Sequence, residues 1–210
     1  MQVGELLPRL RPFGPRAALL KLHSDLFIVH SRVQPYAQYY PPEMTNLEKL
    51  VVALEDRRFL NHAGVDLISV VREVGRAVSF KRHGGASTID MQFVRTATGY
   101  RKPTAWRKFY EMLLAYFIQY RYSKITILRS YLDCAFFGSH LIGARRAAQS
   151  MFSADYRELT IEQAAMLAAM LVYPRPLEGG ETWLAKVRRR SDYGMRVYIA
   201  NKKRFDQLPR

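Results

Sequence analysis

Cysteine is almost absent from this chain of 210 residues, in which Cys134 is the only one. A single cysteine excludes an intramolecular disulfide and the usual cysteine-based zinc sites, and it leaves the redox compartment undetermined. Long apolar runs are lacking too, since the most apolar early stretch, 17–30, contains Lys21, His23 and Asp25. A spanning helix needs roughly 20 apolar residues, and the N-terminus shows no secretory signal pattern. We therefore expect any membrane association to be peripheral, or to depend on sequence outside these residues.

Acidic residues are scarce as well. The sequence has 18 aspartates and glutamates against 33 lysines and arginines, which gives a formal net charge of +15 and a pI near 10.1. This imbalance indicates an anionic partner, and nucleic acid, acidic lipid headgroups and pyrophosphate all qualify. The hydrophobic content of 49% is enough for a full core, so one domain is the default expectation.

Proline is concentrated near the start of the chain. The density of prolines in residues 1–44 predicts an irregular lead-in that belongs to the domain and contains one short strand, 26–29. Regular structure should begin at Thr45, because Thr45 and Glu48 form a capping-box pattern ahead of a helical repeat of apolar residues. That helix would carry Glu55 near its C-terminal end. We assign the main domain to 45–200 and a basic tail to 201–210.

The rest of the chain also has helical periodicity, so we predict a mostly α fold. Amphipathic spacing predicts helices over 66–80, 87–97, 104–120, 123–137, 160–171 and from 181 onwards. Ser87 is the expected N-cap of the second of these, and Thr160 with Gln163 forms another capping box. The 104–120 helix carries a wide apolar face, formed by Phe109, Met112, Leu113, Tyr116, Phe117 and Tyr120.

Two segments contain side chains suited to chemistry. In 55–64, the adjacent carboxylates of Glu55 and Asp56 are followed by His62 where a helix should give way to a loop, a setting that suits acid–base catalysis. In 84–92, glycines lead into hydroxyl and amide groups at a helix N-terminus, where backbone N–H groups can bind phosphate. Solvated or arginine-paired carboxylates and an ordinary helix cap are the plainer alternatives.

Two further segments place cations on helices. Arg107 and Glu111 are four residues apart and share one helix face, so an ordinary intrahelical ion pair is the simplest interpretation. Lys124 precedes an apolar stripe, where a solvated lysine is equally simple.

The order of these four segments resembles the motif set of the family 51 peptidoglycan glycosyltransferases, over roughly residues 45–177. The matching patterns are Glu55-Asp56-x-x-Phe59-x-x-His62-x-Gly64, Gly85-x-Ser87-Thr88-Ile89-x-x-Gln92, Arg107-Lys108-x-x-Glu111 and Lys124-x-x-Ile127-Leu128-x-x-Tyr131-Leu132. The resemblance implies a lysozyme-like helical domain with a smaller membrane-facing lobe near 65–84. It also implies that lipid II is polymerised into glycan strands by inverting transfer, with release of undecaprenyl pyrophosphate.

The resemblance implies a role for each matched residue. Glu55 would be the general base toward the acceptor hydroxyl, and Glu111 the second carboxylate, acting directly or through a divalent cation such as Mg²⁺ or Mn²⁺. The cations expected to stabilise the leaving pyrophosphate are Arg95, Arg107, Lys108 and Lys124. The residues expected to contact sugar or phosphate, or to shape the site, are Asp56, Phe59, His62, Gly85, Ser87, Thr88 and Gln92.

The implied partners are lipid II, the growing glycan strand, a membrane surface and other cell-wall synthesis proteins, and no nucleic acid is expected. The implied location is the outer, periplasmic face of the bacterial inner membrane, where the protein would be peripheral or anchored. Three other functions fit parts of the sequence. They are a non-catalytic lipid II-binding module, a nucleic-acid binder that uses the basic clusters 186–190 and 202–204, and a glycan-cleaving enzyme suggested by fold analogy alone.

Five positions depart from the family pattern. Asp90 stands where a threonine is usual, Met91 replaces one of two glutamines, and Arg129 replaces a glutamate. Asp133 replaces an asparagine, and Gln119 replaces a glutamate. None of these changes touches the two expected catalytic carboxylates, so we predict an active but divergent enzyme.

Overall fold

The structure is a computed structural model that describes residues 14–33, 43–78, 87–100 and 103–206. Within these residues helices predominate, and the one sheet is a pair of short strands. The mostly α prediction is therefore confirmed. The loop expected at 81–86, with Gly85, lies outside the described residues.

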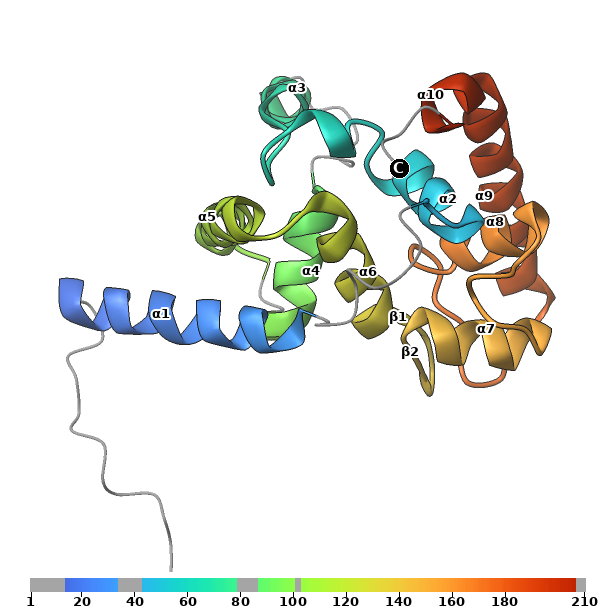
Figure 1. Ribbon diagram of the computed structural model, residues 1–210, viewed down its shortest axis with the longest axis horizontal. Coiled ribbons are helices and arrows are strands. Elements are labelled where there is room, and N and C mark those ends of the chain that lie inside the picture. Colours follow the sequence, from blue (N-terminus) through green and yellow to red (C-terminus); the bar gives the residue numbers. More distant parts are fainter. Residues whose placement is uncertain (1–13, 34–42, 79–86, 101–102, 207–210) are drawn as a thin grey trace, which may run out of the picture.

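The helices and strands run in the following order (Figure 1): α1 (Pro15–Arg32), α2 (Asn46–Glu55), the 3₁₀ turn η2 (Phe59–Asn61), α3 (Leu67–Val78), α4 (Ile89–Thr98), α5 (Ala105–Arg121), α6 (Lys124–Cys134), β1 (Phe136–Gly138), β2 (Leu141–Ile142), α7 (Ala144–Phe152), α8 (Ile161–Ala169), α9 (Glu181–Ala200) and α10 (Lys202–Asp206). The strands form an antiparallel hairpin in which Phe136 pairs with Ile142 and Gly138 with Leu141.

The lead-in is helical where we expected irregular chain, so the predicted strand at 26–29 is wrong. Those residues lie in α1, which begins with Pro15 in its first turn, the one place where proline suits a helix. The remaining early prolines fall outside 16–34, so they do not interrupt α1. The helix packs on α4 and α5 and buries Val29. Its Asp25 accepts hydrogen bonds from the hydroxyls of Tyr100 and Tyr110.

Most helix boundaries agree with the sequence, with three corrections. The N-cap of α4 is Thr88 and not Ser87, because the Thr88 hydroxyl is the one that accepts from the Met91 N–H, at 3.2 Å. Helix α6 stops at Cys134, since the chain turns into the hairpin before residue 137. Helix α8 stops at Ala169, two residues before its predicted end at 171. Both predicted capping boxes are present.

Helix α2 buries seven of its ten residues and packs on α8 and α9, which also pack on each other, while α4 packs on α6 and α5 (Figure 1). The alanine-rich α8 allows this close approach, because five of its nine residues are buried and four of those are alanine. On α9, Gly194 lies directly against Leu54, near the end of α2. A Cβ at Gly194 would come within 2.9 Å of the Leu54 side chain. This contact brings one face of α9 up to the C-terminal end of α2.

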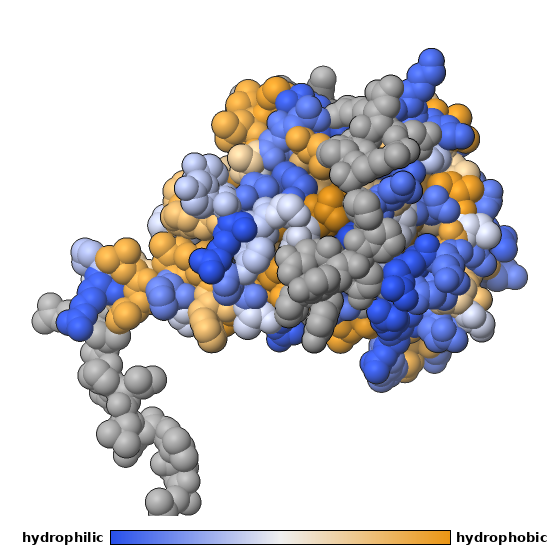
Figure 2. Space-filling view, viewed as in Figure 1, coloured by the Kyte–Doolittle hydropathy of each residue, from blue (hydrophilic) through white to orange (hydrophobic). Residues whose placement is uncertain are grey.

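The apolar face predicted on α5 is present, but much of it faces outward. The side chains that α5 buries are Glu111, Leu114, Ala115 and Ile118, whereas Phe109, Tyr116, Phe117 and Tyr120 are exposed. Apolar side chains are also exposed on α1 and α3, and hydrophobic atoms gather over these helices in Figure 2. No helix among the described residues is both long and apolar enough to cross a bilayer.

Candidate active site

A cleft of about 750 Å³ opens at the C-terminal end of α2. Its walls come from the end of α2 and the following loop, the start of α3, the start of α4, and α9. The lining side chains are Leu54, Glu55, Asp56, Arg57, Arg58, Asp66, Ser69, Arg72, Ser87, Thr88, Gln92, Val172, Arg190 and Tyr193. Two of the four sequence motifs therefore meet in one cavity.

Glu55 is the last residue of α2, and its carboxylate is held by two donors. Gln92 Nε2 donates to one oxygen and Arg190 Nη2 to the other, each at 3.2 Å. The amide of Gln92 is oriented in turn by Tyr131, whose hydroxyl donates to Gln92 Oε1 at 2.7 Å. The side chain of Glu55 is 12% exposed, so its carboxylate is held in place and still reachable from the cleft.

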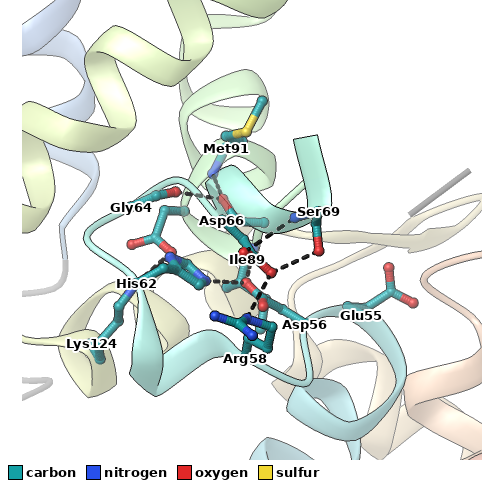
Figure 3. A network of polar contacts seen from close by, with 12 residues as sticks. Glu55, Asp56, Arg58, His62, Gly64, Asp66, Ser69, Ile89, Met91 and Lys124 are labelled. Carbon is teal, nitrogen blue, oxygen red and sulfur yellow. Dashed lines mark hydrogen bonds and ion pairs between the residues drawn. The ribbon is translucent and has the colours of Figure 1, made fainter. Parts of the chain in front are cut away.

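Asp56 points away from Glu55 into a buried network (Figure 3). One oxygen of Asp56 lies 2.9 Å from His62 Nε2 and also accepts the Ile89 N–H, which ties the α2 end to the start of α4. The other ring nitrogen of His62 lies 3.3 Å from Lys124 Nζ. Adjacent carboxylates thus face different surroundings: Glu55 faces the cleft, and Asp56 supports the loop that follows α2.

At the end of this network Lys124 forms an ion pair with Asp90, a residue that departs from the family pattern. Lys124 Nζ donates to Asp90 Oδ2 at 2.9 Å and lies 4.6 Å from the centre of the Phe59 ring. Burial raises the pKa of Asp90 to about 6, although Lys124 opposes the change, and burial also lowers the pKa of Lys124 against the opposing effect of Asp90. The lysine ammonium is thereby neutralised by a buried carboxylate, and Lys124 does not line the cleft.

Glu111 is fully buried and held by two arginines. Arg95 donates to both of its oxygens, each at 3.1 Å, and Arg107 Nε lies 3.4 Å from Oε1. The second guanidinium leaves one positive charge in excess over the single carboxylate. Arg95 Nη2 also reaches the hydroxyl of Ser87 on the cleft wall, at 3.4 Å. Neither arginine lines the cleft itself, and Arg95 is connected to it through the Ser87 side chain.

The other expected site residues are spread over the core and the surface. Phe59 is fully buried, and Thr88 is buried, with its hydroxyl donating to the carbonyl oxygen of Gly64 at 2.6 Å. Lys108 is half-buried on α5, outside the lining of the cleft.

The residues present do not fit a divalent cation well. Both oxygens of Glu111 are taken by guanidinium groups. Within the described ranges, one group has metal-ligand geometry: oxygens or nitrogens of Asp56, His62 and Asp90 all lie within 4.8 Å of one another. The Lys124 ammonium already supplies the positive charge there, and a metal would have to displace it.

Arg129, another departure from the family pattern, is structural here. Its guanidinium donates to Glu48 at 2.8 Å in the interior and also to the carbonyl oxygen of Glu43. The reversed charge at 129 therefore has a partner on α2, and Arg129 does not line the cleft. Met91 is fully buried in the core, so the amide missing at this position is replaced by apolar packing.

Sequence reasoning missed nine of the residues that line the cleft: Leu54, Arg57, Arg58, Asp66, Ser69, Arg72, Val172, Arg190 and Tyr193. Arg190 contacts Glu55, and the ring of Tyr193 lies 5.7 Å from the Arg57 guanidinium and 5.9 Å from that of Arg190. The run of basic residues on α9 was visible in the sequence, but it suggested a nucleic-acid-binding surface and not a wall of this cleft. Contact with Glu55 joins residues 135 positions apart, so no local pattern could show it.

Comparison with known proteins identifies the family. A model of the transglycosylase family matches residues 29–196. The chain is 36% identical over 153 residues to penicillin-binding protein 1A of Rickettsia bellii. These aligned residues make up 71% of this chain and 19% of that relative. It is 42% identical over 125 residues to penicillin-binding protein 1A of Neisseria lactamica, and here the aligned residues make up 59% of this chain and 16% of that relative. The chain thus spans about a fifth of the length of these relatives. It belongs to the transglycosylase family, the glycosyltransferases of peptidoglycan synthesis.

Proposed function

We propose that this chain polymerises lipid II into glycan strands by inverting transfer and releases undecaprenyl pyrophosphate. The observation that carries the proposal is the position of Glu55, which is held between Gln92 and Arg190 at the wall of the cleft. A base must lie within hydrogen-bond reach of the proton it removes, and an acceptor sugar in this cleft can approach the Glu55 carboxylate directly. Glu55 would take the proton of the acceptor hydroxyl as the oxygen attacks the anomeric carbon of the donor.

The leaving pyrophosphate needs positive charge that is already in place, since fixed charges stabilise a developing anion best where water is excluded. Arg95 and Arg107 together carry one charge more than Glu111 neutralises, and Arg95 reaches the cleft wall at Ser87. We assign the leaving-group side to this arginine pair. Lys124 contributes less in this chain, because Asp90 neutralises it. No step of this mechanism runs through a metal ion.

Membrane association belongs to the same proposal, since the donor and acceptor carry lipid chains. Large apolar side chains are exposed on three helices: Leu19, Leu20, Phe27 and Ile28 on α1, Leu67, Ile68 and Val71 on α3, and Trp106, Phe109 and Tyr120 on α5. Exposed apolar side chains can insert into the surface of a bilayer, and a net charge of +15 attracts the chain to anionic lipids, so the two features together suit the interface of an anionic bilayer. We propose that the protein works at the outer face of the inner membrane beside other cell-wall synthesis proteins.

The decisive test is a lipid II polymerisation assay in detergent or liposomes. We expect Glu55→Gln to lower the rate by about a hundredfold or more, the range that general-base catalysis supplies. Glu178→Gln is the matched control, because Glu178 is exposed in the loop before α9 and should leave the rate unchanged. Chain length read on a gel reports the product.

The alternative functions predict other results. Lipid II binding by the unaltered chain and by Glu55→Gln, with no polymer from either, would establish the non-catalytic binding module. Shortening of preformed glycan strands by the unaltered chain would establish cleavage in place of synthesis.

A further inference from the structure

A second hollow, about 640 Å³ in volume, lies on α9 next to the cleft. It is lined by Tyr173, Lys186, Arg189, Arg190, Tyr193 and Arg196. Four of these six side chains are cations, the other two carry hydroxyl groups, and none is a carboxylate. We call this set of six residues the basic hollow.

Three of its cations have no carboxylate partner among the described residues. In the part of the chain that the structure describes, Lys186, Arg189 and Arg196 form no ion pair with a carboxylate, whereas Arg95, Lys124 and Arg129 all do. Like charges gathered in a concave site repel one another, and their combined field concentrates anions there. The basic hollow therefore has the electrostatics of an anion-binding site.

The architecture of α9 presents these side chains together. The helix buries Val187, Ser191, Gly194, Val197 and Tyr198 against the core. Lys186, Arg189, Tyr193 and Arg196 follow one another at intervals of three or four residues, so they share a neighbouring face. Across the hollow, the backbone of Tyr173 is tied to α9, because Trp183 Nε1 donates to its carbonyl oxygen at 2.8 Å. Both walls of the hollow are thus connected to one helix.

The basic hollow is continuous with the cleft. Arg190 and Tyr193 line both cavities, and Arg190 itself contacts Glu55. Arg57, on the cleft side, donates to the hydroxyl of Tyr193. The hollow therefore opens on the Glu55 side of the cleft, while the Arg95–Glu111–Arg107 group belongs to a different wall, at Ser87.

We propose that the basic hollow is an anion subsite that binds a phosphate or carboxylate group of the acceptor substrate while its sugar lies at Glu55. This inference rests on the proposed function for the identity of the substrate. It places the anion on the side of the base, apart from the cations that receive the leaving group.

Anion binding to the whole chain tests this subsite without needing turnover. The probes are inorganic pyrophosphate, a short peptide with two free carboxylates, and the same peptide with both carboxylates amidated, each titrated by NMR. We expect Arg189→Gln combined with Arg196→Gln to weaken binding of the preferred anion about tenfold, since two charged hydrogen-bond donors are lost. Both residues are exposed, so the fold should be unchanged by circular dichroism.

Arg188→Gln is the matched control. Arg188 is exposed on the same helix but does not line the hollow, so its loss changes the net charge without changing the site. A selective loss for pyrophosphate assigns the subsite to phosphate, and a selective loss for the diacid assigns it to carboxylate. An equal loss in Arg188→Gln, or no saturable binding of either anion by the unaltered chain, overturns the proposal. An absence of polymerisation with selective anion binding would instead count against the proposed function alone.

Discussion

Gly64 shows how closely single residues determine the loop that carries His62. Its φ is +81°, and a Cβ there would lie 2.5 Å from the carbonyl oxygen of Ala115. We expect Gly64→Ala to lower the free energy of unfolding by about 3 kcal/mol or more, because backbone strain and a steric clash act together. Gly99→Ala is the control, since Gly99 has a similar φ of +70° with nothing within 4 Å, and it should cost only about 1 kcal/mol. Equal losses in urea denaturation would contradict this account.

Asp90 should make stability depend on pH. Its pKa is about 6 in the folded protein because burial opposes ionisation, and it is about 3.9 in an unfolded chain. Between these values the folded state binds more protons than the unfolded state, so this residue's contribution to the free energy of unfolding falls as pH rises from about 4 through about 6. The groups that face it are Lys124, His62 and Asp56.

Urea denaturation across that pH range, on the unaltered chain and on Asp90→Asn, measures this contribution. The difference between the two curves should change most between pH 4 and 6 and level off above it. Parallel curves would show that Asp90 does not titrate in this window.

At the scale of elements, α2 and α6 are joined by the buried pair of Glu48 and Arg129. The Nε–Oε1 distance is 2.8 Å, and the side chains are only 1% and 7% exposed. We expect Arg129→Met to cost about 3 kcal/mol, because it leaves a buried carboxylate without its cation. Adding Glu48→Gln should recover much of that loss, since the second change removes the charge and keeps an oxygen for the capping contact with the Thr45 N–H. Thermal unfolding of the two variants measures the difference.

The double variant decides between a structural and a catalytic role for Arg129. Recovery of stability together with polymerisation would identify Arg129 as structural. Recovery of stability without polymerisation would show that the cation at 129 also serves the reaction.

At the scale of the whole molecule, net charge and exposed apolar side chains should act together at a lipid surface. We expect the chain to sediment with anionic vesicles more than with neutral ones, and salt should weaken only the electrostatic part of the binding. Replacing Trp106 and Phe109 with serine should lower the vesicle partition coefficient at least tenfold, because each ring contributes roughly 2 kcal/mol when buried. Leu177→Ser is the control, since Leu177 is equally exposed in the loop before α9. Matching losses would rule out α5 as a membrane contact.

The sequence by itself determined the helical class, the family and most helix starts. These depend on local physics: the capping boxes at Thr45 and Thr160 satisfy backbone donors a few residues away, and apolar spacing selects the helical period. Placement of Glu55 at the end of its helix followed from the same short-range pattern. The prediction failed for the lead-in. The many prolines suggested an irregular chain, but Pro15 lies in the first turn of α1 and the rest of that helix contains no proline.

Only the tertiary structure decided which side chains share a cavity. Arg190 meets Glu55 because Gly194 allows α9 to pack against Leu54, and no short pattern relates residues so far apart in the chain. Asp90 was visible in the sequence as a departure from the family pattern. Its ion pair with Lys124, however, forms only because α4 and α6 pack together and largely bury both side chains. The outward direction of the apolar face of α5 was decided in the same way, since periodicity reveals a face and only packing reveals what the face contacts.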